Sequence, residues 1–216
     1  MTDYTSILTT KALPFKTEYT TIWDYNRFDL SDPSNVDYGV SQIMNYPTRH
    51  LWISLPCGPS HVTGYTPAAT KRWIANTVKL IHAQIENNGY VYLEAPADDT
   101  AWNVADTAWQ SVLQECTKPV YRDMCFDHLK AIGGDSIQRT TRIQTNKTHF
   151  QLHFGQRCPG SPPFPHVNEK LFPYDFYLPQ YPPQFCSRAV KLMSESQKRQ
   201  NKVRQFWDCL LYTSDA

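Results

Sequence analysis

Two short apolar segments, each ended by a proline and joined through one amphipathic stretch, limit what this chain can fold into. The first covers residues 51–55 and stops at Pro56, and the second covers residues 90–93 with Pro96 shortly after it. Continuous apolar runs of this length are typical of strands that are covered on both faces. The pattern predicts two parallel strands of a βαβ unit with a right-handed crossover.

The stretch between these two strands has helix signals at both ends. Thr66 and Pro67 suit the N-cap and first positions of a helix, and Gly89 follows two asparagines that stop it. Between these ends, apolar residues recur at helical spacing, namely Ile74, Val78, Ile81 and Ile85. This spacing gives the predicted helix one apolar face that can pack against a sheet.

The rest of the chain carries further signals for the same architecture. Asp98 or Asp99 can cap a helix that keeps its apolar face as far as Glu115. Other elements are predicted as a strand at 19–23, a helix at 36–44, strands at 120–126 and 141–144, and a basic helix at 185–207. Together these elements predict an α/β fold with a Rossmann-like parallel sheet, flanking helices and an incomplete N-terminus.

The chain has 216 residues, which is the size of one ordinary domain. We expect an irregular segment at 1–20, an α/β core at 21–155, and a proline-rich loop followed by a basic helix at 156–207. The residues from Cys209 to the end resemble the translation of a transposase adapter used for sequencing libraries. Residues 208–216 are therefore interpreted as an artefact tail, and the chain as a metagenomic fragment.

Composition limits the class of protein. A hydrophobic content of 41% and an aromatic content of 13% exclude a disordered chain. No run approaches the roughly 18 apolar residues of a membrane span, so we expect a soluble, intracellular protein, cytoplasmic or nuclear, with no membrane contact. The six cysteines lack the dense spacing of a disulfide scaffold. The net charge of +1 neither predicts nor excludes nucleic-acid binding, and the oligomeric state stays open.

Cys57 and Glu94 form the candidate reactive pair. Cys57 follows the first strand in the order Pro-Cys-Gly-Pro, and Glu94 ends the second strand in the order Glu-Ala-Pro. Ligands of open parallel sheets bind beyond the carboxyl ends of the strands, and strands joined by one crossover are usually neighbours. We therefore expect the thiol and the carboxyl group side by side. The alternatives are that Cys57 is a buried structural thiol and that Glu94 caps a neighbouring loop.

This arrangement resembles the C5 cytosine-specific DNA methyltransferases, whose corresponding motifs are Pro-Cys and Glu-Asn-Val. Residues 123–129 are similar to the segment before that family's arginine motif, and residues 138–142 resemble the motif Gln-x-Arg-x-Arg itself. The nearest similarity is to a divergent set with Thr-Arg-Ile-x-Thr-Asn, here 141–146, and a Cys-x-Gly and histidine segment, here 158–166. The resemblance covers roughly residues 22–190, and several motifs in order are more specific than one.

The resemblance implies a role for each residue of the site. Cys57 would add to carbon 6 of cytosine as the nucleophile, and Glu94 would hydrogen-bond or protonate N3. Arg142, with Arg139 as the alternative, would hold the base or an adjacent phosphate. DNA would be the partner, with the target base flipped out of the duplex, and S-adenosyl-L-methionine would supply the methyl group.

The chain departs from this family at the cofactor site. The glycine-rich cofactor loop has no counterpart, because no glycine lies before Gly39, and Ala95 replaces the usual asparagine. By resemblance the cofactor contacts would be Asp29, Pro56 and Ser54, with Asp24 as an alternative acidic position. The chain is therefore interpreted as a methyltransferase-like domain, with a catalytically silent binding or structural module, encoded by a mobile element, as the alternative.

Two further classes of site stay open from the sequence. A cysteine hydrolase would pair Cys57 with His61 or another histidine, and it needs an oxyanion hole as well. A zinc site is conceivable from residues that are common zinc ligands, namely His149, His153, Cys158, His166 and Cys186. Their spacing matches no compact zinc finger, so we predict no metal and interpret these histidines as solvated. Cys116 and Cys125 are interpreted as core thiols.

Overall fold

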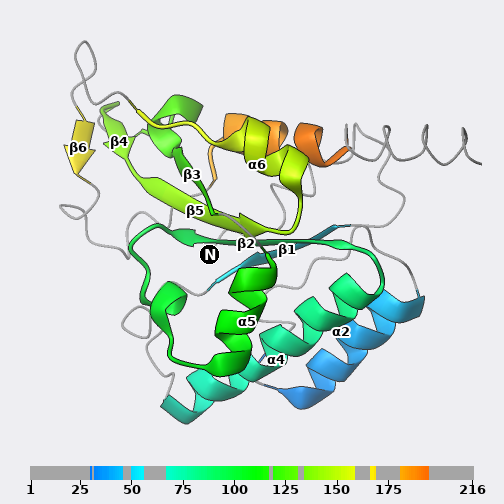
Figure 1. Ribbon diagram of the computed structural model, residues 1–216. Helices are drawn as coiled ribbons and strands as arrows, with labels where there is room; N and C mark the ends of the chain where they lie inside the picture. The colour runs from blue at the N-terminus through cyan, green and yellow to red at the C-terminus, as the bar shows by residue number, and fades with distance from the viewer. Residues whose placement is uncertain are drawn as a thin grey trace, which may run out of the picture.

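A four-stranded sheet lies between two layers of helices (Figure 1). The computed structural model describes residues 30, 32–45, 50–55, 67–116, 119–130, 134–158, 166–168 and 181–194. One face of the sheet is covered by α2 (Pro33–Asn45), α4 (Pro67–Glu86) and α5 (Thr107–Glu115). The other face is covered by α6 (Thr148–Phe154) and a helical segment at 183–194. The α/β class predicted from the sequence, a sheet with flanking helices, is confirmed.

The predicted βαβ unit is present. Strand β1 (His50–Ser54) pairs in parallel with β2 (Tyr90–Pro96), in a register that aligns Ser54 with Glu94. Helix α4 connects the two strands and ends just before Asn87, as its stop signal predicts. The register follows from the two apolar runs, because a shift by one residue would turn each buried side chain to the wrong face.

The prediction of a fully parallel sheet is wrong. The strand order is β1-β2-β5-β3, and β5 (Thr140–Thr145) runs antiparallel to both β2 and β3 (Val120–Asp123). A parallel neighbour requires a long crossover, usually through a helix. Between β3 and β5 the chain instead forms the 3-10 helix η3 (Met124–Asp127) and the short strand β4 (Ser136–Gln138), and then turns back. The connection therefore delivers β5 in the opposite direction.

Alternation along the strands divides the interior into two cores. On β2, Val91, Leu93 and Ala95 belong to the core under α2, α4 and α5, whereas Tyr92 belongs to the core on the opposite face. The second core combines aliphatic residues with a group of aromatic ones, among them Phe150, Phe154, Tyr181 and Phe185. Glu94 has the same parity as Tyr92, so its side chain faces the second core.

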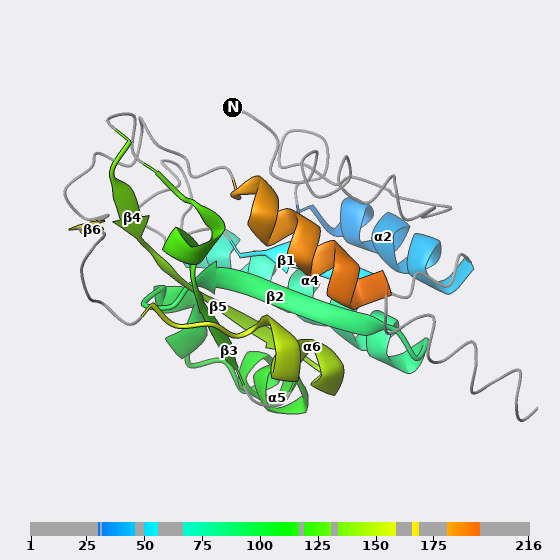
Figure 2. The same ribbon diagram turned by 90° about the horizontal axis from the view of Figure 1, so that it is seen from above.

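The two helices on the second face lie over different parts of the sheet. Seen from above, α6 lies towards β3 and the 183–194 segment lies towards β1 (Figure 2). Their contact is aromatic, because the rings of Phe154 and Phe185 meet edge to face with centroids 5.1 Å apart. The first part of the helix predicted at 185–207 is present, over 183–194, and its basic second half lies outside the described residues.

Two other predicted elements differ from the structure at their ends. The helix expected from Asp98 or Asp99 to Glu115 is divided into the 3-10 helix η2 (Thr100–Asn103), capped by Asp99, and α5, capped by Asp106. The Asp106 carboxylate accepts a hydrogen bond from the Trp109 amide at 2.9 Å, which starts a new helix there. The strand predicted at 120–126 ends at Asp123, where η3 begins.

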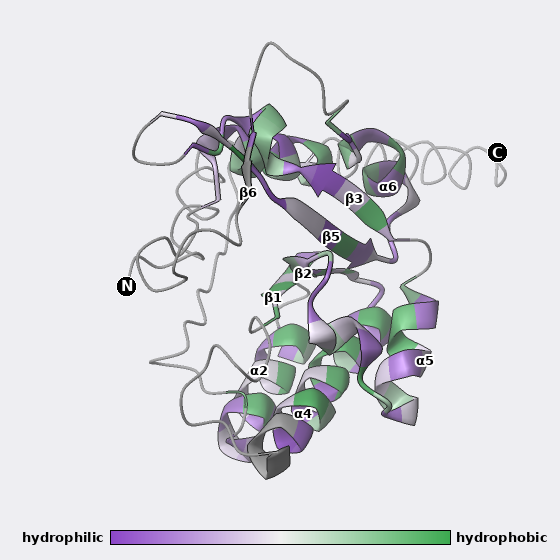
Figure 3. Ribbon diagram, turned by 90° about the vertical axis from the view of Figure 1, so that its left-hand side faces the viewer, coloured by the Kyte–Doolittle hydropathy of each residue, from purple (hydrophilic) through white to green (hydrophobic). Residues whose placement is uncertain are grey.

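The helices of the described part are amphipathic. Figure 3 shows hydrophobic and hydrophilic residues together on α2 and α4, as expected of helices that cover one face of a sheet. Within the described ranges, no helix has both the length and the hydropathy that crossing a bilayer requires. The strand predicted at 19–23 lies outside these ranges.

Candidate functional site

Glu94 is the centre of a buried polar cluster at the ends of β1 and β2. Its side chain is 2% exposed, and both of its carboxyl oxygens accept hydrogen bonds from hydroxyl groups. Thr141 Oγ1 donates to one oxygen, and the Tyr181 hydroxyl donates to the other. The hydroxyl groups of Ser54 and Tyr181 lie 2.8 Å apart. The cluster is therefore a buried carboxyl group beside three hydroxyl groups, of which that of Ser54 belongs to an exposed residue.

Three separate elements bring these hydroxyl groups to Glu94. Ser54 is aligned with Glu94 by the parallel register of β1 and β2. Thr141 comes from the antiparallel neighbour β5, and its hydroxyl also donates to the Ala95 carbonyl at 3.1 Å. Tyr181 precedes the 183–194 helix, and its ring stacks on Phe185 with centroids 5.0 Å apart. The cluster therefore joins the sheet to the C-terminal helix that covers it.

Burial raises the pKa of the Glu94 carboxyl group above its usual range. Arg139, Thr141, Tyr181 and Ser54 each favour the charged form and oppose this shift, but the loss of hydration outweighs them. Burial and the neighbouring Glu94 also raise the pKa of Tyr181 well above its usual value. A carboxyl group of this kind holds its proton at higher pH than an exposed one, so it can serve as a general acid.

The structure separates the two predicted arginines. Arg139 is 5% exposed and interacts electrostatically with Glu94. The Arg142 side chain lies on the opposite face of the sheet, where its guanidinium group is 4.4 Å from the ring centroid of Trp102. Its Nη2 also donates to Gln144 Oε1 at 2.8 Å. Arg139, the sequence alternative, is therefore the arginine that accompanies Glu94.

The remaining predicted site residues lie mostly outside the described ranges. This applies to Cys57, Pro56 and Asp29. The described chain reaches Leu55, whose amide donates to the Glu94 carbonyl oxygen at 2.8 Å. Leu55, which precedes Cys57 by two positions in the sequence, therefore lies beside Glu94.

Ser54 is the one predicted cofactor contact within the described ranges, and its hydroxyl is engaged with Tyr181 inside the Glu94 cluster. Ser54 is nevertheless an exposed residue, so its contact with Tyr181 does not close it off from solvent. The other two predicted contacts, Asp29 and Pro56, lie outside the described residues, so these residues hold only one of the three contacts that the resemblance implies for S-adenosyl-L-methionine.

Sequence reasoning missed two members of the cluster. Thr141 carries a signal in retrospect, because residues of β5 alternate between the faces and Thr141 follows the predicted arginine Arg139 by two positions. Tyr181 carries no comparable signal. It lies at the end of a proline-rich stretch, far from Glu94 in sequence, and only the packing of Phe185 places it there.

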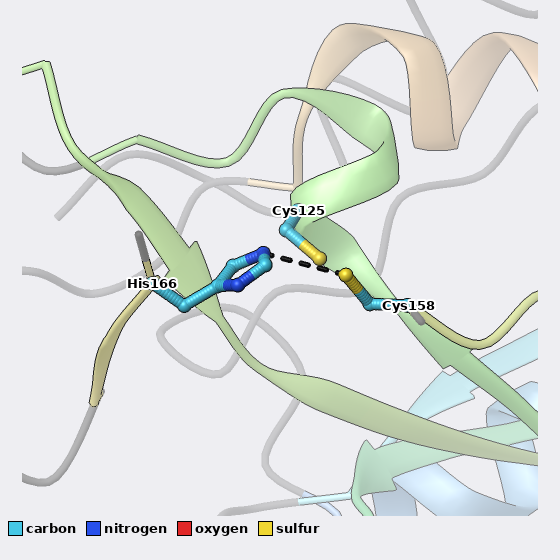
Figure 4. A group of neighbouring side chains, drawn as sticks. All are labelled: Cys125, Cys158 and His166. Carbon is cyan, nitrogen blue, oxygen red and sulfur yellow. Dashed lines mark hydrogen bonds between the residues drawn. The ribbon is translucent and has the colours of Figure 1, made fainter. Parts of the chain in front are cut away.

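A second polar cluster contains sulfur and imidazole ligands. Cys158 and His166, two of the five residues considered for zinc, lie together, with Sγ and Nε2 3.4 Å apart (Figure 4). The third member is Cys125, which is half-buried rather than a core thiol as predicted. Burial is the largest cause, and Cys158 the next, of a rise in the pKa of Cys125 to about 12. Cys116 is buried, as predicted.

The other three residues considered for zinc lie elsewhere. His149 and His153 contact each other on α6, with ring centroids 4.5 Å apart. Cys186 is fully buried, and its thiol donates to the Tyr181 carbonyl at 3.9 Å. The structure therefore divides the five residues into three groups and adds Cys125 to one of them.

A hollow of roughly 590 Å³ lies between α6 and the edge strand β3. Its walls come from Pro119, Val120, Tyr121, Gln151, Leu152, Gly155, Gln156 and Arg157. No predicted site residue belongs to this set, so the hollow is separate from the Glu94 cluster.

Comparisons of the chain with protein-family models, curated proteins and solved structures find no match. Function is therefore inferred from the residues and their geometry.

Proposed function

We propose that this chain is a C5 cytosine methyltransferase-like domain in which Cys57 is the nucleophile and Glu94 is the general acid. The observation that carries this proposal is the Glu94 carboxyl group, which is buried and has a raised pKa. The Glu94 backbone is hydrogen-bonded to Leu55, two residues before Cys57 in the sequence. An acid that keeps its proton is what addition to cytosine requires, because the ring nitrogen N3 must be neutralised as the thiolate attacks.

The proposed covalent step uses only these two groups and the base. The Cys57 thiolate forms a bond to carbon 6, and the electron pair of the C5–C6 double bond moves through the ring towards N3. N3 takes the proton of Glu94, which becomes a carboxylate. Arg139 interacts electrostatically with Glu94 and would stabilise that carboxylate. Carbon 5 of the resulting enamine is then nucleophilic.

DNA is the proposed substrate, and the target base would be flipped out of the duplex to reach Glu94. In the structure both carboxyl oxygens are covered, by Thr141 and Tyr181. The base would therefore have to replace the Tyr181 hydroxyl as the partner of Glu94. Arg139 rather than Arg142 is the arginine placed to act beside the base, since Arg142 lies on the opposite face of the sheet.

S-adenosyl-L-methionine is the methyl donor that the family resemblance implies. Of the three implied contacts only Ser54 lies within the described residues, where its hydroxyl is 2.8 Å from that of Tyr181. The proposal is therefore limited to the covalent addition, and its test must not depend on the cofactor.

The experiment is covalent trapping by DNA that contains 5-azacytosine. The ring nitrogen at position 5 makes carbon 6 more electrophilic, so a thiolate can form an adduct without a methyl donor. We expect a protein–DNA adduct that disappears in Cys57→Ser and weakens in Glu94→Gln. The matched controls are Cys116→Ala, a buried thiol, and Glu115→Gln, an exposed carboxylate. An adduct that persists in Cys57→Ser would contradict the proposal.

A second candidate is a catalytically silent module, and the closed state of the cluster favours it. Glu94, Tyr181 and Ser54 satisfy one another without a ligand, and they tie the 183–194 helix to β1 and β2. A buried polar network of this kind can serve to specify one packing arrangement of the two layers. Absence of an adduct with folded wild-type protein would select this candidate.

A further inference from the structure

Two thiols and one imidazole converge at the cluster of Cys125, Cys158 and His166. Their ligand atoms all lie within 4.8 Å of one another, and the sulfur of Cys158 is 3.4 Å from Nε2 of His166. Figure 4 shows the side chains of all three turned towards a common point. Cys158 and His166 are eight residues apart, whereas Cys125 lies more than thirty residues before them, so the fold brings the third ligand to the other two.

Each of the three residues is held by its own backbone contacts. Cys125 lies on η3, where its carbonyl accepts a hydrogen bond from the His128 amide at 3.1 Å. The amide of Cys158 donates to Asp123 Oδ2 at 2.6 Å. His166 begins β6 (His166–Asn168), which pairs in parallel with β4. The ligands are therefore carried by anchored backbone.

We propose that Cys125, Cys158 and His166 bind one zinc ion. Thiolate sulfur and neutral imidazole nitrogen are the ligands that zinc prefers in proteins, and two thiolates balance the charge of Zn²⁺. In a tetrahedral zinc site, two ligand atoms are about 3.5–3.8 Å apart. The observed separation of 3.4 Å between Cys158 and His166 needs only a small outward movement to match this.

Three protein ligands fill three of the four tetrahedral positions. The fourth position is then available to a water molecule or another donor. Asp123 supports the site from outside, because its carboxylate accepts hydrogen bonds from the Cys158 amide and from Thr140 Oγ1. Such supporting contacts fix the orientation of metal ligands.

The zinc ion would join two parts of the domain. Strands β4 and β6 form a separate two-stranded sheet of three-residue strands, and a sheet that small is marginal without additional ties. The η3 helix that carries Cys125 also holds the start of β5, because the Met124 amide donates to the Arg139 carbonyl at 2.8 Å. Zinc would therefore stabilise the backbone that carries Arg139 to Glu94.

A disulfide between Cys125 and Cys158 is the competing use of the same two sulfurs. It would oxidise both thiols and transfer two electrons to an external oxidant, and it would leave His166 without a function. Mass spectrometry separates the two cases, because the disulfide form is lighter by two hydrogen atoms and retains no metal.

The test is the metal content of the full-length protein, purified in a reducing buffer and measured by elemental mass spectrometry. We expect one zinc per chain in the wild type and loss of that zinc in Cys125→Ser, Cys158→Ser and His166→Gln. The controls are Cys116→Ala, a buried thiol outside the cluster, and His153→Gln, an exposed histidine on α6. Both controls should keep the wild-type zinc content.

A second measurement covers variants that fail to fold. Wild-type protein is stripped with a chelator and titrated with Co²⁺, and sulfur-to-cobalt charge-transfer absorption reports thiolate coordination directly. Absorption that saturates at one equivalent and is displaced by Zn²⁺ supports the site. No such absorption, zinc that persists in all three ligand variants, or a Cys125–Cys158 disulfide in the reduced preparation would overturn it. These readouts are independent of DNA, so they succeed or fail separately from the proposed reaction.

Discussion

The two polar clusters of this domain differ in what their polar atoms contact. In the Glu94 cluster, the protein itself supplies a hydrogen bond to each carboxyl oxygen, and the group is enclosed. In the cluster of Cys125, Cys158 and His166, three metal-ligand atoms face one another. The first cluster can hold or release a proton, whereas the second can hold a cation. Stability should therefore depend on pH through the first cluster and on metal through the second.

Removal of zinc should have the largest effect. An ion present at about 1,000 times its dissociation constant stabilises the folded state by about 4 kcal/mol. For a domain of this size that corresponds to a fall of about 10 °C in Tm after chelation. Thermal unfolding with a chelator, followed by zinc addition, measures the shift. The same fall in Tm should occur in Glu94→Gln, whose zinc ligands are intact. A Tm that does not change when the chelator is added would show that the fold does not depend on a bound metal.

Tyr181→Phe should have the next largest effect. The change removes the hydroxyl that donates to Glu94 and leaves a buried carboxyl oxygen without that donor. An unsatisfied buried group of this kind costs about 1–3 kcal/mol. Urea unfolding measures the loss, and Tyr38→Phe is the control because Tyr38 is 53% exposed. Equal stability of the two variants would show that the cluster is not closed in solution.

Glu94 should also make stability depend on pH. Its pKa is raised above the ordinary value of 4.5, so the folded protein binds the proton more tightly than the unfolded chain. The free energy of unfolding should therefore fall as pH rises from 4.5 through the pKa of the folded state. Chemical denaturation at a series of pH values, compared with Glu94→Gln, isolates this contribution. A wild-type free energy of unfolding that, relative to Glu94→Gln, rises as the pH is raised above 4.5 would contradict the sign.

The smallest expected effect is on the pKa of Glu94, which should respond differently to substitution of the two arginines. Arg139 is the strongest of the groups that lower the pKa of Glu94, so Arg139→Gln should raise that pKa further. Arg142→Gln should leave it unchanged, because Arg142 lies on the opposite face over Trp102. Carbon-13 NMR of the Glu94 carboxyl group during a pH titration measures both. A larger shift in Arg142→Gln would show that the sheet faces are assigned wrongly.

The βαβ unit could be predicted because its signals are local. The apolar runs mark β1 and β2, and Pro67 and Gly89 mark the ends of α4. Once these elements are known, the parallel pairing and the position of Glu94 follow from the crossover. Glu94, the proposed acid of the candidate site, could therefore be identified from the sequence.

The direction of β5 could not be predicted in the same way. Its sequence period indicates a strand but not which way the strand runs. Direction was decided by the connection from Asp123 to Thr140, whose short elements η3 and β4 leave no crossover helix. The prediction of a parallel sheet was wrong because it assumed a crossover connection before β5.

The contacts between residues that are distant in the chain also could not be predicted from the sequence. Tyr181 reaches Glu94 only because Phe185 packs into the second core. Cys125 joins Cys158 and His166 only because η3 and β6 both lie beside β4. Such contacts depend on tertiary packing, which leaves no periodic pattern in the chain.

Hydrogen exchange at carbon 5 of cytosine tests the proposed reaction most directly. Reversible addition of Cys57 to carbon 6 makes carbon 5 exchange its hydrogen with solvent, and this requires the acid Glu94 but no methyl donor. With DNA that carries tritium at carbon 5, wild-type protein should release tritium into water, and Cys57→Ser and Glu94→Gln should not. Release that is equal in all three proteins, or absent from folded wild-type protein, would contradict the assignment of Cys57 and Glu94 as nucleophile and acid.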